Sequence, residues 1–555
     1  MALLIRGGQL LNSTQMALEP ADVLIEADQI VAVGCKLSCP PGTEELSATG
    51  YLILPGLANA HTHAHNNLFK GLADNWTLED LLMHGPALNG CRTPEDHYLS
   101  AAIGAIEMLK TGCTAAYDLF MSVPAPSSEV VEAVVRAYID VGLRAVVAPA
   151  VGDVVFYRVV PGLFDILPSD LRQTVEQIQA DPTAGLLQIT ENTIRLWHGA
   201  AGGRIRVAVA PTIPGQCSDD FLLGCGRLAQ EYGVGLHTHL AESKVQAVYA
   251  QRRWGTTIVG HLADLGLIRP GFVGAHGVWL TPEDIQRLAD AGAAVAHNPA
   301  SNLKLGSGIA PTREMLDRGL AVGLGTDGSM SSDNLNMFEA MRFAALVNKV
   351  RFPHDQDNWV GAREVYRMAT QGSARLLGLA DDIGAVAPGR KADLVLLRTN
   401  SVFLQPLNQP LNALVYAETG ADVTTVLVGG RVVLDHGRVL TVDEGQLQTQ
   451  AQKAADRLRA QNTTAWGLAQ QLRPYVAAAC RAAVASPYPV NRYAVPIISE
   501  DIFSPLGEGQ GKRYNQGLDE PSSALTERQS SRYVSPQWSD WASLLTLGST
   551  FKTHD

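Results

Sequence analysis

The chain has few of the features that mark secreted or membrane proteins. Its seven cysteines are odd in number and include no CxxC pair, which favours reduced thiols over a disulfide framework. No apolar run approaches the roughly 18 residues of a membrane span. The start, MALLIRGGQLLNS, has no charged leader before a cleavable apolar segment. We therefore expect a cytoplasmic protein without membrane contact.

The chain also has fewer positively than negatively charged residues. The 43 Lys and Arg residues face 55 Asp and Glu residues, a net charge of −12. Such a chain offers no basic field for a phosphate backbone, so we expect a small-molecule substrate and no nucleic-acid partner. At 555 residues it is long enough for a large barrel with additional modules.

Short apolar runs rich in Val, Leu, Ile and Ala recur along the chain, each followed by glycine or polar residues. This pattern is typical of strands buried on both faces of a parallel sheet. The eight candidate strands cover residues 52–60, 114–119, 143–150, 205–210, 234–239, 272–276, 293–297 and 321–326. Helical segments lie between several of them, so the sequence predicts an α/β fold, a (β/α)8 TIM-type barrel.

The chain ends have a different pattern. Residues 1–54 alternate apolar and polar positions, and a similar alternation returns in residues 381–445. We expect these ends to form one small β-sandwich domain, with the barrel at residues 55–380 inserted between them. Residues 446–495 predict a helical extension, and the polar, irregular residues 496–555 predict a disordered tail.

Residues able to bind metal or transfer protons follow several of the apolar runs. They are His61 and His63 in LANAHTH, His239 and Glu242 in GLHTHLAE, His276 in GAHG and Asp327 in GLGTDG. Active sites of β/α barrels gather at the carboxyl ends of the strands, so residues far apart in sequence converge there.

Two of these residues, His61 and His63, are two positions apart and project to the same side of an extended backbone. Together with His239 and Asp327 they offer three nitrogens and one oxygen. That donor set suits one divalent metal ion, Zn²⁺ by preference and Fe²⁺ as an alternative.

His237 competes with His239, because both point the same way. Glu242, three residues after His239, can reach a metal-bound water and carry its proton, so we assign His239 to the metal, Glu242 to acid–base catalysis and His237 to barrel packing. Metal-bound hydroxide is the expected nucleophile. Asp327 would orient it, and His276 would donate a hydrogen bond to the oxygen or to the substrate atom under attack.

The remaining histidines carry weaker signals. His297 ends an apolar run and either lines the pocket or packs structurally, with neither favoured. His65 is expected to face a loop, and His97 to be a solvated surface residue.

The segments LPGLANAHTHAH, HLAES, GAHGVWL, HNPASNLKLGSGIAP and GTDGSMSSDNLNMFEAMR resemble the aminohydrolase branch of the amidohydrolase superfamily. That branch includes S-adenosylhomocysteine and methylthioadenosine deaminases, guanine deaminase and triazine hydrolases. The resemblance covers roughly residues 1–445. It implies the same metal ligands, the same roles for Glu242 and His276, and a homo-oligomer.

One segment departs from the adenosine-type members of that branch. Where they carry a PHAPYTCS-like segment, this chain reads PTIPGQCS, with Thr212 in place of the substrate-facing histidine. Thr212 and Gln216 are therefore candidates for contacting a different heterocycle or an amide, although an ordinary loop explains them equally well.

The sequence thus predicts a metal-dependent aminohydrolase that replaces an exocyclic amine of an N-heteroaromatic compound by hydroxyl. Hydrolysis of an amide, carbamate, urea or chloro-triazine bond in the same site is the alternative, because the residues do not distinguish these leaving groups. A non-catalytic assembly protein on this fold is an alternative of a different class. The complete set of candidate ligands argues against a non-catalytic protein, and stoichiometric bound metal would exclude it.

Overall fold

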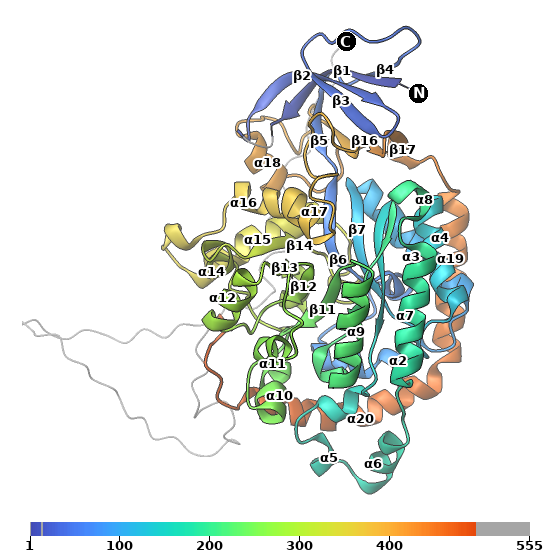
Figure 1. The fold of residues 1–555 in the computed structure, drawn as a ribbon, viewed down its shortest axis with the longest axis vertical. Helices are drawn as coiled ribbons and strands as arrows, with labels where there is room; N and C mark the ends of the chain where they lie inside the picture. Colours follow the sequence, from blue (N-terminus) through green and yellow to red (C-terminus); the bar gives the residue numbers. More distant parts are fainter. Residues whose placement is uncertain (1, 13–14, 495–555) are drawn as a thin grey trace, which may run out of the picture. The chain divides into compact units, whose positions relative to one another are not determined.

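The computed structural model describes residues 2–12 and 15–494 (Figure 1). The barrel strands form two parallel sheets, one in the order β10–β8–β7–β6 with β9 also beside β8, and one in the order β11–β12–β13–β14. Their bounds are β6 Leu57–Thr62, β7 Cys113–Phe120, β8 Arg144–Val151, β9 Ile205–Val207, β10 Ala210–Pro211, β11 Leu236–Leu240, β12 Phe272–His276, β13 Ala294–His297 and β14 Ala321–Leu324. Parallel bridges Thr62–Asp327 and Val209–Leu236 join the two sheets at both seams, as a TIM barrel requires.

Two predicted strands are divided. The run 52–60 splits into β5 (Tyr51–Pro55) and β6, with Gly56 between them. A Cβ at Gly56 would lie 2.1 Å from Oγ1 of Thr114, so only glycine fits where the chain leaves one sheet and enters the barrel. The run 205–210 likewise divides into β9 and β10.

Helices cover the barrel strands on the outside (Figure 1). The longer ones are α3 Pro94–Lys110, α4 Ser128–Val141, α7 Thr183–Trp197, α9 Asp219–Glu231, α10 Lys244–Trp254, α12 Pro282–Asp290 and α15 Met337–Arg351. Serine or threonine side chains cap five of them, α3, α4, α9, α10 and α12. In α12, Thr281 and Asp284 form a capping box.

Strands from both chain ends form a second structure, a nine-stranded sheet. Its order is β18–β17–β16–β15–β5–β1–β2–β3, with β4 beside β1. The strands not yet given are β1 Ala2–Leu11, β2 Leu18–Glu26, β3 Gln29–Gly34, β4 Glu44–Ser47, β15 Leu394–Arg398, β16 Val423–Val428, β17 Arg431–Asp435 and β18 Arg438–Val439. Antiparallel pairing of β5 with β15 joins the two ends.

Two further helices follow this sheet, α19 (Glu444–Gln461) and α20 (Thr463–Val484). The first packs against α3, and the second packs against α10 and against α1 (Leu78–Met83) and α2 (Gly85–Asn89). The predicted disordered tail, 496–555, lies outside the described residues. Within the described part of the chain, no helix combines the length and hydropathy needed to cross a bilayer.

Candidate metal centre

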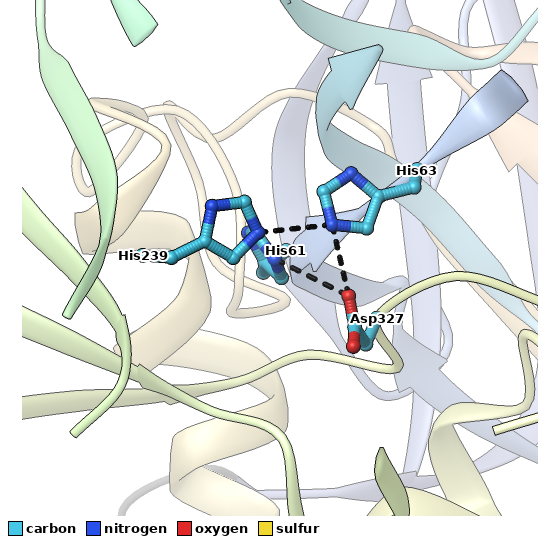
Figure 2. Close-up of side chains that lie close together, drawn as sticks. All are labelled: His61, His63, His239 and Asp327. Carbon is cyan, nitrogen blue, oxygen red and sulfur yellow. Dashed lines mark hydrogen bonds and ion pairs between the residues drawn. The ribbon is translucent and has the colours of Figure 1, made fainter. Parts of the chain in front are cut away.

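Four of the predicted residues meet at the carboxyl ends of the barrel strands. His61 lies in β6 and His63 directly after it, His239 lies in β11, and Asp327 follows β14. One ligand atom from each lies within 4.8 Å of the others, and all four residues are buried. Figure 2 shows the three imidazoles and the carboxylate facing one another.

Backbone carbonyls orient two of the imidazole rings. Nδ1 of His63 lies 2.6 Å from the Leu119 carbonyl oxygen, and Nδ1 of His239 lies 2.6 Å from that of Thr212. A carbonyl accepts hydrogen bonds only, so each Nδ1 carries the proton and each Nε2 keeps its lone pair. The two Nε2 atoms face each other at 3.1 Å. Both rings thus present ligand atoms to one point.

The carboxylate of Asp327 is oriented in the same way. Its Oδ2 accepts hydrogen bonds from the hydroxyls of Ser301 (2.6 Å) and Ser331 (2.8 Å). Its Oδ1 lies 3.0 Å from Nε2 of His63 and 3.4 Å from Nε2 of His61. One carboxylate oxygen is therefore held by serines and the other is directed at the histidines.

These side chains fit a divalent cation. Both ring nitrogens of His61 and Oδ1 of Asp327 are buried without a hydrogen-bond partner, a costly arrangement that a metal ion would relieve. Burial lowers the pKa of His61 to about 3, so its ring is neutral, as a ligand must be. Burial alone would raise the pKa of Asp327, but the neighbouring imidazoles of His61 and His63 hold it well below its usual value.

Unusual backbone geometry accompanies this arrangement. His276 has φ +71° and Asp327 has φ +60°, in the left-handed region that side chains other than glycine rarely adopt. Gly325 brings β14 close to β6, because a Cβ there would lie 2.8 Å from the His61 carbonyl oxygen and 2.3 Å from Oδ1 of Asn298. Two residues with strained backbone and one close approach of neighbouring strands therefore lie at the candidate site.

Glu242 and His276 lie beside the four ligands. One atom each of Glu242, His276 and Asp327 lies within 4.8 Å of the others, and Oε2 of Glu242 is 3.6 Å from Nε2 of His276. Burial, followed by the charges of Asp327 and Glu79, raises the pKa of Glu242 well above its usual value. This carboxyl group therefore keeps its proton to a higher pH than an exposed glutamate does.

The surroundings of His276 bear on its predicted donor role. Its Nδ1 lies 2.9 Å from Oδ1 of Asn302, and its Nε2 lies 3.4 Å from Nδ2 of Asn298. Burial lowers the pKa of His276, so the ring is neutral. With Nδ1 donating to Asn302, Nε2 is an acceptor. It becomes a donor only after taking up a proton.

A cavity opens beside the four candidate ligands His61, His63, His239 and Asp327, which we call the metal group. Thr212 and Gln216 line it, together with apolar residues such as Phe156. Oγ1 of Thr212 and Nε2 of Gln216 are buried and lack partners. His297, a candidate substrate contact, ends β13 but is absent from the described residues that line this cavity. Its buried ring has no hydrogen-bond partner.

Sequence reasoning missed other members of the site. His65 was expected to face a loop, but it is buried, lines the cavity and accepts a hydrogen bond from the Met121 amide at 2.9 Å. The HTHAH pattern carried a signal for it, since a third histidine continues the alternation. Ser301 lies in the short helix α13 (Pro299–Lys304) and Ser331 lies in a turn, and no sequence signal distinguished either of them.

Comparison with known proteins adds family information. The model of the amidohydrolase family matches residues 52–433. A 5-methylthioadenosine/S-adenosylhomocysteine deaminase of Caldanaerobacter subterraneus subsp. tengcongensis is 35% identical over 82% of this chain and 99% of its own length. A 5'-deoxyadenosine deaminase of Methanothermobacter thermautotrophicus is 34% identical with the same coverage.

Solved structures agree. A zinc-bound adenosine deaminase from Xanthomonas campestris superposes with a TM-score of 0.73 at 26% identity, over 82% of this chain and 98% of its own. The atrazine chlorohydrolase of Arthrobacter aurescens TC1, complexed with zinc, gives a TM-score of 0.73 at 29% identity, over 82% and 100%. The fold, the buried ligand group and these similarities lead to one assignment. The chain belongs to the amidohydrolase family.

Proposed function

We propose that the protein is a metal-dependent aminohydrolase that replaces the exocyclic amine of an N-heteroaromatic compound by hydroxyl and releases ammonia. The observation that carries this proposal is the buried carboxyl group of Glu242 beside the ligand group. The two curated relatives named above, both called deaminases of adenosine-derived compounds, support it.

A single divalent ion is part of the proposal. His61, His63, His239 and Asp327 would hold it, and we propose zinc, because three imidazole nitrogens with one carboxylate oxygen suit it and two similar structures contain it. When bound, the ion would supply Lewis-acid activation of a water molecule. The homo-oligomer expected from the resemblance stays a prediction.

Glu242 moves the protons. Because its pKa is raised, its carboxyl group starts protonated and gives that proton to the ring nitrogen next to the amine. It then takes a proton from the attacking water and passes it to the leaving amine. The carbon–oxygen bond forms, the carbon–nitrogen bond breaks and ammonia departs. The proton on the ring nitrogen then returns to Glu242, which restores its carboxyl group and leaves the neutral hydroxylated product. Nε2 of His276, an acceptor in its neutral form, orients the attacking water.

The substrate lies against Thr212 and Gln216. Their unpartnered buried polar atoms, Oγ1 and Nε2, can hydrogen-bond to nitrogen and oxygen atoms at the edge of a heterocycle. The apolar wall, including Leu81 and Phe156, suits the faces of a flat ring. His297 has no part in this proposal.

We also propose that the sheet formed by the two chain ends folds over into a small β-sandwich beside an inserted barrel. A bridge joins Gln29, at the start of edge strand β3, to Lys391, just before β15. Buried apolar side chains from both chain ends, including Ile5, Val23 and Leu396, share one core.

The test is ammonia release by the purified, metal-loaded protein across aminated purines, pyrimidines, pterins and triazines. Glu242→Gln should lower kcat by about 10²- to 10⁴-fold with metal content unchanged, because the amide cannot carry the proton. Glu129→Gln, at an exposed site on α4, is the matched control and should keep full activity.

Other outcomes distinguish the alternatives. Bound metal without ammonia release from any amine would favour hydrolysis of amide, carbamate, urea or chloro-triazine bonds. Absence of bound metal after loading would favour the non-catalytic assembly protein and exclude the proposal.

A further inference from the structure

A second cavity, of about 550 Å³, lies at the amino ends of the barrel strands. Its wall includes the first residues of three strands, Leu236 of β11, Phe272 of β12 and Ala294 of β13. The metal group lies at the opposite, carboxyl ends of the same barrel. The volume is within the range of small-molecule sites, and neither the family assignment nor the proposed reaction gives this cavity a role.

The formally charged residues of this wall are Arg206, Arg269 and Arg375, and none of the described residues that line it is Asp or Glu. Arg206 is paired with Asp382 at 3.0 Å. Arg269 donates only to uncharged groups, the side chain of Gln230 at 3.2 Å and a backbone carbonyl. In the described part of the chain, neither Arg269 nor Arg375 has an ion-pair partner. The cavity therefore carries uncompensated positive charge.

A buried hydroxyl lies in the wall of the cavity. Tyr117 lines it and is 1% exposed, and its Oη has no hydrogen-bond partner. A buried hydroxyl left unpaired destabilises the protein, and a bound acceptor would offset this cost. Next to it, Gly235 has no side chain, and a Cβ there would lie 3.1 Å from this Oη. The ring of His237 packs edge-on against Tyr117 and closes the barrel interior behind it.

We propose that this cavity binds a small organic anion. Its carboxylate or phosphate group pairs with Arg269 and Arg375, its apolar body lies against Leu236 and Phe272, and a polar atom at its far end accepts the hydrogen of Tyr117 Oη. The proposal stands independently of the reaction at the metal group.

The experiment is calorimetric titration of the metal-loaded full chain with benzoate, 4-hydroxybenzoate and phenyl phosphate. Benzoate and phenyl phosphate separate a carboxylate ligand from a phosphate ligand. The Arg269→Gln/Arg375→Gln variant should weaken binding of the preferred probe at least tenfold, because both charges are lost. Tyr117→Phe should weaken 4-hydroxybenzoate severalfold and leave benzoate unchanged.

The matched control, Arg253→Gln/Arg287→Gln, removes the same charge from exposed positions outside this cavity and should bind all probes like the parent protein. Binding that survives the Arg269→Gln/Arg375→Gln substitution would place the probe elsewhere, for example at the metal group, and would overturn the proposal. So would the absence of binding by all three probes at millimolar concentration, or equal weakening in the control.

Discussion

Single residues decide how the metal group is assembled, and Gly325 is the clearest case. In Gly325→Ala the new Cβ would meet backbone and side-chain atoms of His61 and Asn298 at 2.3–2.9 Å, so β14 must move away from β6. We expect at least a tenfold loss of metal affinity and of activity, because ligand geometry tolerates little displacement. Metal titration of the purified variant measures the affinity. Gly185→Ala, where nothing lies within 4 Å of the new Cβ, is the control, and equal metal affinity in both variants would contradict this reading.

At the same scale, His97 links stability to pH. Expected at the surface, it is 1% exposed, and both ring nitrogens lack partners. Burial, followed by the charge of Arg92, lowers its pKa to about 3. The folded state therefore favours the neutral ring. The stability that the buried neutral ring allows is fully present above about pH 6.5, and it is lost progressively as the pH falls toward 3, because the unfolded chain takes up a proton that the folded chain does not.

The variant His97→Phe removes this titration. Between pH 7 and 4.5, the free energy of unfolding of the parent protein should fall by about 2 kcal/mol more than that of the variant. Denaturant titrations at the two pH values measure the difference. Parallel losses in the two proteins would mean that His97 takes up no additional proton on unfolding.

Between elements, one buried ion pair joins the barrel to the sheet formed by the chain ends. Arg144 of β8 donates two hydrogen bonds of 2.9 Å to Asp393, just before β15, and both side chains are buried. Arg144→Met would leave a buried carboxylate unpaired, at a cost of about 3–5 kcal/mol in stability. Chemical denaturation tests this against Arg172→Met, which breaks an exposed pair with Glu176 and should cost under about 1 kcal/mol. Equal losses of stability in the two variants would contradict a stabilising role for the buried pair.

At the scale of elements, the sequence predicted the barrel strands well, because short apolar runs followed by glycine or polar residues are typical of buried parallel strands. The division at Gly56 was not predictable, since β5 and β6 are both buried and form one continuous apolar run. Only the approach of Thr114, a tertiary contact, places the break.

The convergence of His61, His63, His239 and Asp327 followed from the rule that polar residues at strand ends meet at one barrel face. The groups that orient these side chains could not be predicted from the sequence. The carbonyls of Leu119 and Thr212 that orient two of the rings are backbone groups without a sequence signal. Whether the four side chains bind metal in solution stays a prediction.

For the whole molecule, metal and stability should be coupled. Because three buried histidines and an aspartate face one another, removing the ion should destabilise the folded state. Dialysis against a chelator should lower Tm, and added Zn²⁺ at about 1,000 times its Kd should restore about 4 kcal/mol. Calorimetry measures both. The Tm of Asp327→Asn should rise little when zinc is added. If the Tm of the parent protein changes with neither chelator nor zinc, the ion has no structural role.

The pairing of β5 with β15 also has a consequence during synthesis. Strand β5 leaves the ribosome long before its partner β15 exists, since the whole barrel is translated in between. At about 5–20 residues per second this interval is on the order of half a minute. During it, the edge of β5 that will pair with β15 is open to other chains. We therefore expect this edge of the nascent chain to be exposed to wrong pairing until its end has been made.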